Sequence, residues 1–121
     1  MIEPKVIRGL HLQKPPIEQA KLVHVLKGRI YDVAVDLRPG SKTFKQWFAV
    51  DLSDENDLSL YIPEGFAHGF YAYEESIVSY KCSEHYSPSH DAGVHWNDPS
   101  INILWPEMSD LIVSEKDARL P

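Results

Sequence analysis

The stretch YIPEGFAHGF (61–70) contains a proline, a glycine and a histidine in the pattern P-x-G-x-x-H, at Pro63, Gly65 and His68. Proline restricts its own φ to a value suited to turns, and glycine readily adopts the positive φ that most residues avoid. Apolar residues lie on both sides of the pattern. The stretch therefore predicts a tight turn between two strands, with the histidine on the second strand.

Short apolar segments separated by turn signals continue on both sides of this stretch. Residues 29–37 alternate between apolar and polar side chains with a period of two, and no long window shows a clear helical period. Further strands are predicted at 21–28, 44–52, 58–62, 67–73 and 76–86, with turns at 38–41 and 53–57. Residues 109–121 predict a short strand followed by a loop or a single helical turn. Many short strands at this spacing predict an all-β sandwich or barrel.

Length and composition exclude several classes of protein. The 121 residues suit one domain, and 43% hydrophobic residues are enough for a packed core. The net charge is −6 and no Lys/Arg cluster exceeds two neighbours, which argues against nucleic-acid binding through phosphates. No segment resembles a signal peptide or a membrane span. The single cysteine, Cys82, excludes an internal disulfide and favours a cytoplasmic location.

The P-x-G-x-x-H pattern matches the second motif of the cupin β-barrels, in which the histidine points into the barrel mouth. A turn followed by a histidine packed in a β-core explains the same residues, so the motif alone leaves both interpretations open. A metal-binding cupin also needs an H-x-H pair and an acidic ligand in its first motif. The stretch RGLHLQ (8–13) offers His11 but has Gln13 at the second position. Two histidines are too few for a closed metal site, and we expect no metal.

Three further residues have both a structural and a functional interpretation. Lys21 shares a strand face with Val23 and Val25, so its side chain lies either at a barrel rim or in a cavity. Tyr80 lies on an apolar strand face, which is typical of a core residue. Asp117 lies near the C-terminus, where a solvated turn is the ordinary interpretation. None of these patterns identifies a function by itself.

Taken together, the segments resemble the dTDP-4-dehydrorhamnose 3,5-epimerase family of deoxysugar biosynthesis. The matching segments follow the family's order from Val6 to Ala118: RGLHLQ, AKLVHVLKGRIYDVAVDLRPGSKTF, WFAVDLS, YIPEGFAHGF, SYKC, GVHWNDPSINILWP and VSEKDA. The resemblance implies an all-β fold, the cupin-like double-stranded β-helix (jelly-roll) barrel, in a single domain over residues 1–121. It also implies a homodimer that acts on a nucleotide-linked sugar without a metal or other cofactor.

The resemblance further implies which residues form the site. His11 would be the catalytic base and Asp117 would orient it. Lys21 would stabilise the enolate, and Tyr80 would return a proton from the opposite face of the sugar. The residues implied in substrate binding are Arg8, Gln13, His68, Tyr86 and Lys116.

These residue types suit proton transfer next to a ketone, because the base must titrate near the working pH, as histidine does. We therefore expect epimerisation at C3, C5 or both carbons of a nucleotide-linked 4-keto-6-deoxyhexose. The family carries a longer segment before RGLH than the seven residues in this chain, and that segment helps to close the site. Two alternatives therefore stay open: an epimerase for a different nucleotide-linked keto sugar, and a nucleotide-sugar-binding protein without turnover.

Overall fold

The computed structural model describes residues 1–106 and 110–121, whose strands form two sheets. The larger sheet has the order β4-β3-β6-β1-β8, and β9 pairs in parallel with β1 outside this path. Its strands are β1 (Val6–Gln13), β3 (Arg29–Asp36), β4 (Trp47–Ser53), β6 (Phe66–Ala72), β8 (Asp91–Gly93) and β9 (Ile112–Val113). The smaller sheet has the order β5-β2-β7, formed by β2 (Lys21–Lys27), β5 (Ser59–Ile62) and β7 (Ile77–Cys82).

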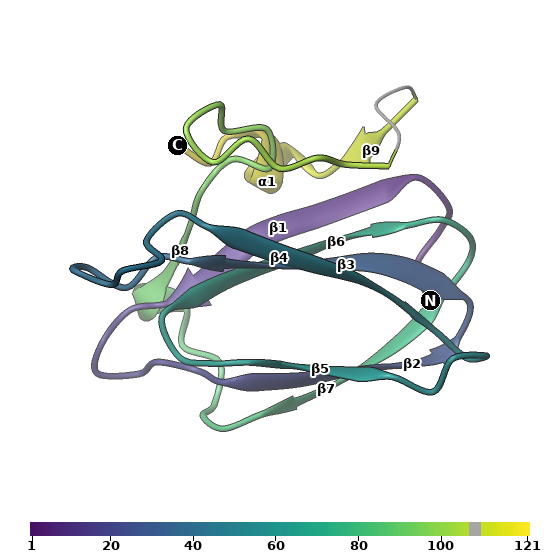
Figure 1. The fold of residues 1–121 in the computed structure, drawn as a ribbon, viewed down its shortest axis with the longest axis horizontal. Helices are drawn as coiled ribbons and strands as arrows, with labels where there is room; N and C mark the ends of the chain where they lie inside the picture. The colour runs from purple at the N-terminus through teal and green to yellow at the C-terminus, as the bar shows by residue number, and fades with distance from the viewer. Residues whose placement is uncertain (107–109) are drawn as a thin grey trace.

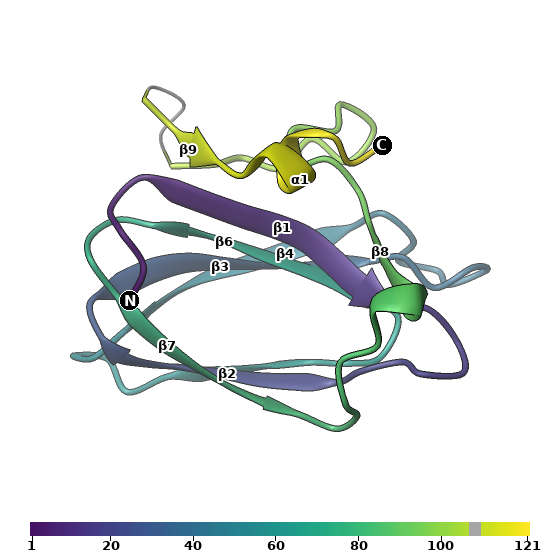
Figure 2. The ribbon, with the colours of Figure 1, turned by 180° about the vertical axis from the view of Figure 1, so that it is seen from behind.

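The two sheets face each other as layers (Figure 1). The C-terminal segment, with β9 and the short helix α1 (Glu115–Ala118), lies on the outer side of the larger sheet, away from the smaller one (Figures 1 and 2). A 3-10 turn, η1 (Pro88–His90), precedes β8 near the end of β1. This arrangement confirms the all-β prediction and is the cupin-like jelly roll that the family resemblance implies. In the part of the chain that the structure describes, no helix is long and apolar enough to cross a membrane.

Strand β3 illustrates how one sequence pattern serves two layers. Its alternation directs Ile30 and Ala34 toward the smaller sheet, and Val33 and Val35 toward the C-terminal segment. Both pairs are buried, because another layer covers each face of the strand. By the same alternation Asp32 belongs to the inward set, so a carboxylate lies inside the barrel.

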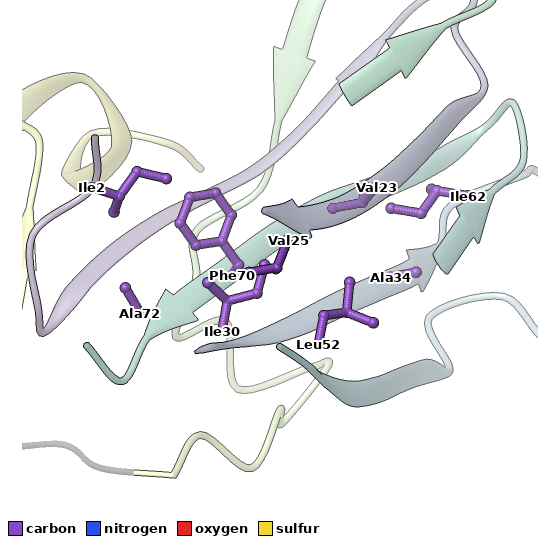
Figure 3. Close-up of a cluster of buried hydrophobic side chains, with 9 residues drawn as sticks. All are labelled: Ile2, Val23, Val25, Ile30, Ala34, Leu52, Ile62, Phe70 and Ala72. Carbon is purple, nitrogen blue, oxygen red and sulfur yellow. The ribbon is translucent and has the colours of Figure 1, made fainter. Parts of the chain in front are cut away.

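The main core fills the space between the sheets, and Figure 3 shows the side chains that form it. Its members are Ile2, Val23, Val25, Ile30, Ala34, Leu52, Ile62, Phe70 and Ala72. Truncation of a fully buried leucine to alanine typically costs about 2–5 kcal/mol, so this cluster is a major source of stability. At the end where β2 begins, polar and charged side chains such as His11 and Lys21 line a cavity next to this core, whose Phe70 also borders the cavity.

A second cluster holds the C-terminal segment against the larger sheet. Ile101, Ile103 and Trp105 are buried there against the outward face of β1, β3 and β6. The Trp105 indole N–H donates to the Trp96 carbonyl at 2.9 Å. This packing brings the last residues of the chain, including α1, next to β1.

The turn predicted from P-x-G-x-x-H is present between β5 and β6. The Phe66 N–H donates to the Pro63 carbonyl at 3.3 Å, and Gly65 has a φ of 84°. A side chain at Gly65 would also collide with Arg38, whose Cγ lies 2.5 Å from an ideal Cβ position. Glycine is therefore required at this position for both conformation and space.

Two predicted strands are shorter in the structure. The strand predicted over 44–52 begins at Trp47, because the Gln46 N–H donates to the Thr43 carbonyl at 2.9 Å and closes a turn. The strand predicted over 76–86 ends at Cys82. The short strand and single helical turn predicted near the C-terminus are confirmed by β9 and α1. Ser109, the first residue of that predicted segment, lies outside the described residues.

Candidate active site

Two adjoining cavities open at the end of the barrel where β1 ends and β2 begins. The larger, of about 280 Å³, is lined by residues that include Arg8, His11, Lys21, His68, Tyr80 and Tyr86. The second, of about 240 Å³, shares His11, Lys21 and Tyr86 with the first and adds Gln13, Asp91 and Lys116. Eight of the nine predicted site residues therefore line one of these cavities. The ninth, Asp117, contacts His11.

The contact between His11 and Asp117 joins the two ends of the chain. The His11 Nε2 atom lies 2.6 Å from Asp117 Oδ1, and the Gly9 N–H donates to Asp117 Oδ2 at 3.1 Å. Ser114 caps α1 by accepting the Asp117 N–H at 3.1 Å, which fixes the start of this helical turn. Asp117 is only 4% exposed, so it does not lie in the solvated turn that its sequence position alone suggests.

This geometry assigns different roles to the two ring nitrogens of His11. When Asp117 is ionised it accepts the Nε2 hydrogen, and the neutral ring then has its free lone pair on Nδ1. His11 lines both cavities, so its ring borders the space that a ligand would occupy. A histidine beside a cavity whose second ring nitrogen contacts a buried carboxylate is an arrangement suited to general-base catalysis.

Lys21 lies at the start of β2 and lines both cavities. Of the two positions that the sequence left open for its side chain, the structure therefore shows the cavity and not the barrel rim. Burial lowers the pKa of the Lys21 ammonium group, while Cys82, Asp32 and Asp91 act in the opposite direction. A partly desolvated ammonium group is a stronger hydrogen-bond donor to a developing anion than one in water.

Tyr80, on β7, borders the larger cavity, and part of its side chain stays open to solvent. Its ring meets the His68 ring edge-on, with 5.9 Å between the ring centroids. Burial raises the pKa of the Tyr80 phenol and Asp32 raises it further, while Arg8 opposes this change. The phenol therefore keeps its proton at neutral pH and can act as a donor.

A second histidine–aspartate pair lies deeper in the barrel and was not predicted from the sequence. His68 Nε2 lies 2.6 Å from Asp32 Oδ1, and both side chains are buried. Among the described residues, Asp32 Oδ2 is the buried side-chain oxygen without a hydrogen-bond partner. The sequence contained one signal for this pair: the period of two places Asp32 on the same face of β3 as Ala34. Sequence analysis interpreted that face as polar and did not assign it to the barrel interior. His68 is thus both buried in a β-core and part of a cavity wall.

Gln13 has a different environment from the one predicted for a sugar-binding residue. Its Nε2 donates to the carbonyls of Ile17 and His85 at 2.6 and 3.2 Å. Its Oε1 accepts the Ser87 N–H at 2.8 Å. These bonds join the loop after β1 to the loop after β7, which carries Tyr86. The Gln13 side chain is 4% exposed, and it holds the cavity wall together while contributing to its surface.

The cavity mouth carries the remaining predicted residues. Arg8 and Tyr86 are exposed there, at the border of the larger cavity. The Lys116 ammonium group donates to Asp91 Oδ2 at 2.9 Å at the border of the second cavity. Within residues 1–106 and 110–121, no group of three or more His, Cys, Asp or Glu side chains is arranged to hold a metal ion.

Two packed β-sheets that enclose a cavity bordered by a histidine–aspartate pair define a cupin-like barrel with a site suited to acid–base chemistry. The family model of the dTDP-4-dehydrorhamnose 3,5-epimerases matches residues 2–121, and the chain belongs to this family. This confirms the resemblance identified from the sequence motifs.

Individual relatives agree with this assignment. The chain is 57% identical over 115 residues to the dTDP-4-dehydrorhamnose 3,5-epimerase of Methanothermobacter thermautotrophicus, covering 93% of this chain and 62% of that protein. The Bacillus anthracis epimerase, solved with TDP and PPi bound, is 52% identical with a TM-score of 0.94, covering 98% of this chain and 68% of that one. The Legionella pneumophila 3,5-epimerase, solved in complex with dTDP-4-keto-L-rhamnose, is 46% identical with a TM-score of 0.92. The latter alignment covers 96% of this chain and 62% of the Legionella chain.

The chain spans about three fifths of the length of the curated relatives it matches, for example 62% and 60% of the first two.

Proposed function

We propose that this protein is an epimerase acting at C3, C5 or both carbons of a nucleotide-linked 4-keto-6-deoxyhexose. The observation that carries the proposal is the His11–Asp117 hydrogen bond of 2.6 Å at a cavity that Lys21 and Tyr80 also line. A base, a cation and a proton donor around one cavity are the groups that epimerisation next to a ketone requires.

The first step removes a proton from the carbon next to the C4 ketone. In this proposal His11 Nδ1 accepts that proton, and the C–H electron pair moves to form an enolate with its charge on the ketone oxygen. Asp117, hydrogen-bonded to Nε2, stabilises the resulting imidazolium and holds the ring in place. A positioned general base contributes about 10²–10⁴-fold in rate.

Lys21 stabilises the enolate in this proposal. Its lowered pKa reflects a partly desolvated ammonium group, which is a strong donor to an oxyanion. Loss of a comparable donor costs about 10²–10³-fold in rate in well-studied enzymes. The negative charge on Asp32 contributes to keeping Lys21 protonated.

Tyr80 then donates its phenolic proton to the opposite face of the same carbon, which inverts the centre. The raised pKa of Tyr80 supports this role, because the phenol remains protonated at neutral pH. His11 releases its proton to solvent and Tyr80 regains one, so each turnover exchanges a substrate hydrogen with water. The reaction involves no net oxidation or reduction.

The nucleotide part of the substrate binds at the mouth of the cavities in this proposal. Arg8 and Lys116 supply positive charge for a diphosphate, and the exposed Tyr86 ring supplies a surface for base stacking. The related Bacillus anthracis structure is solved with TDP and PPi, and the Legionella pneumophila structure with dTDP-4-keto-L-rhamnose. These ligands of close relatives support the same substrate class for this chain.

The test is hydrogen exchange in deuterated water. The protein is incubated with dTDP-4-keto-6-deoxyglucose, and loss of the proton signals at C3 and C5 is followed by NMR. His11→Asn should reduce the exchange rate about 10²–10⁴-fold. His24→Asn, on the outward face of β2 with a hydrogen bond to Ser59, is the matched control and should exchange at the wild-type rate.

Two outcomes would contradict the proposal. One is the absence of exchange with every nucleotide-linked 4-keto sugar tried, in which case tight binding without exchange would favour a binding protein. The other is an unchanged rate in His11→Asn. Exchange at one carbon alone would identify a single-carbon epimerase.

The proposal includes a homodimer as the working assembly. The outward face of the smaller sheet exposes Leu22, Leu26 and Tyr61, whereas the C-terminal segment covers the outward face of the larger sheet. Exposed apolar side chains grouped on one face support an intersubunit contact. Sedimentation equilibrium should give a dimer for the wild type and a shift toward monomer for Leu26→Glu. A monomeric wild type would contradict this part of the proposal.

A further inference from the structure

A second carboxylate, from Asp91, lies on the side of the His11 ring opposite Asp117. Strand β8 pairs antiparallel with β1, with Gln13 opposite Asp91 and His11 opposite Gly93. Because side chains two residues apart share a strand face, this register brings Asp91 beside His11. Asp91 Oδ1 lies 3.9 Å from His11 Nδ1, the nitrogen that Asp117 leaves free.

The other oxygen of Asp91 is held by Lys116. The Lys116 ammonium group lies 2.9 Å from Asp91 Oδ2, and this hydrogen bond raises the pKa of Lys116. Lys116 immediately precedes Asp117 in α1. One helical turn therefore supplies the partner of His11 Nε2 and also the cation that balances the carboxylate next to Nδ1.

We infer that Asp91 is a positioning residue for His11, and that Lys116 limits its effect by neutralising part of its charge. An unbalanced carboxylate next to Nδ1 would favour the protonated ring and keep it from acting as a base. Removal of the carboxylate would weaken the stabilisation of the imidazolium formed during proton transfer. Asp91 and Lys116 together thus keep both the neutral and the protonated form of the His11 ring accessible. The catalytic consequence rests on the proposed function, whereas the electrostatic relationship does not.

Other charged and titratable groups also surround His11 and act on it in every variant. They are Asp117 from α1, His68 from β6, Lys21 from β2, Arg8 from β1 and Tyr86 from the loop after β7. The test must therefore isolate the effect of the Asp91–Lys116 pair. Removing the negative charge of Asp91 in one variant and the positive charge of Lys116 in another does so, because the two changes should shift the His11 titration in opposite directions.

The experiment is an NMR pH titration of the His11 ring in histidine-labelled protein without substrate, with the His11 signal assigned from its loss in His11→Asn. The variants are Asp91→Asn, Lys116→Gln and the double variant. Glu75→Gln and Lys27→Gln are charge-matched controls. Lys27 ends β2, about 20 Å along the strand from Lys21. It pairs with Ile77, two residues after Glu75, so both controls lie near the other end of the barrel.

Asp91→Asn should lower the midpoint of the His11 titration by about half to one pH unit, and Lys116→Gln should raise it by a similar amount. In the double variant the two opposite changes in charge should offset each other, so its midpoint should lie between those of the two single variants. Amide NMR spectra verify that each variant is folded.

Midpoints of the single variants within the range of the controls, shifts of the two single variants in the same direction, or a double variant outside the range between them would overturn the inference. In an active enzyme, the acid limb of the exchange–pH profile should move with the NMR midpoint. Absence of exchange in the wild type would contradict the proposed function and leave the titration to decide the role of Asp91 independently.

Discussion

His11 on β1 and His68 on β6 lie directly opposite each other in the larger sheet, yet each is hydrogen-bonded to a different aspartate at 2.6 Å. The partner of His11 comes from the C-terminal helix, and the partner of His68 comes from the neighbouring strand β3. His11 of the first pair borders both cavities, whereas the second pair is buried, with His68 at the wall of the larger cavity. The two pairs therefore have different tasks, and they can be separated by mutation.

Replacement of Asp117 should reduce activity far more than stability. Asp117→Asn keeps the shape of the side chain but removes the charge that holds hydrogen on His11 Nε2. We expect a loss of about 10²–10⁴-fold in the exchange rate, comparable to other histidine–aspartate pairs. Glu115→Gln, two residues earlier in the same helix and exposed, is the control and should retain the wild-type rate. A rate for Asp117→Asn within twofold of the wild type would disprove the pairing.

Asp32 should affect the site through its charge. It raises the pKa of Tyr80, where burial is the larger cause, and it also raises the pKa of Lys21 against the lowering effect of burial. Asp32→Asn should therefore lower both pKa values. Ultraviolet titration of tyrosine ionisation, with Tyr80→Phe to identify the Tyr80 contribution among six tyrosines, measures the first change. Asp57→Asn, in an exposed turn, is the control, and an unchanged Tyr80 transition in Asp32→Asn would contradict this role.

The sequence predicts the strands and their faces well, because these depend on local alternation and turn residues. Lys21 follows Val23 and Val25 into the barrel as the period of two requires. The contacts that complete the site depend instead on register between distant segments. His11 and Asp117 are 106 residues apart, and only the family resemblance connected them.

The same limit applies to the residues that sequence analysis missed or interpreted incompletely. Asp32 reaches His68 because β3 pairs with β6 with Ala34 opposite His68, and single-sequence patterns do not reveal this register. Asp91 reaches His11 through the pairing of β8 with β1. Gln13 uses its amide to join two loops, and those backbone partners could be identified only from the folded chain.

Acid stability should depend on Asp36, which is buried at the end of β3. Its carboxylate accepts hydrogen bonds from the Arg38 side chain at 3.1 Å and from the hydroxyls of Ser41 and Thr43 at 2.5 Å. The Arg38 hydrogen bond is the largest cause that lowers the pKa of Asp36 far below its usual value of 3.8. A lowered pKa means that the ionised group stabilises the fold above pH about 4, and that this contribution is lost as the pH falls.

Asp36→Asn should therefore reduce the free energy of unfolding at pH 7 by about 2–4 kcal/mol, since it disrupts a buried charged network. The difference from the wild type should shrink as the pH falls from about 5 to 2. Urea unfolding followed by circular dichroism across this range measures both quantities. Glu55→Gln, at an exposed turn position, should leave the pH dependence unchanged. A constant difference between Asp36→Asn and the wild type at all pH values would show that the carboxylate charge is unimportant.

The alkaline limit of activity should be set by Lys21 and not by Tyr80. Burial lowers the pKa of Lys21 from 10.5, whereas burial raises the pKa of Tyr80 from 10.0, so the lysine loses its proton first as the pH rises. Lys21→Arg keeps a positive charge at high pH and should move the alkaline limb of the exchange profile upward. Lys21→Met should reduce the rate about 10²–10³-fold at neutral pH, because the enolate loses its cation. Lys27→Met, at the far end of the same strand, should change neither property. If the alkaline limb stays in place in an active Lys21→Arg variant, another group causes that ionisation and Lys21 does not have the proposed role.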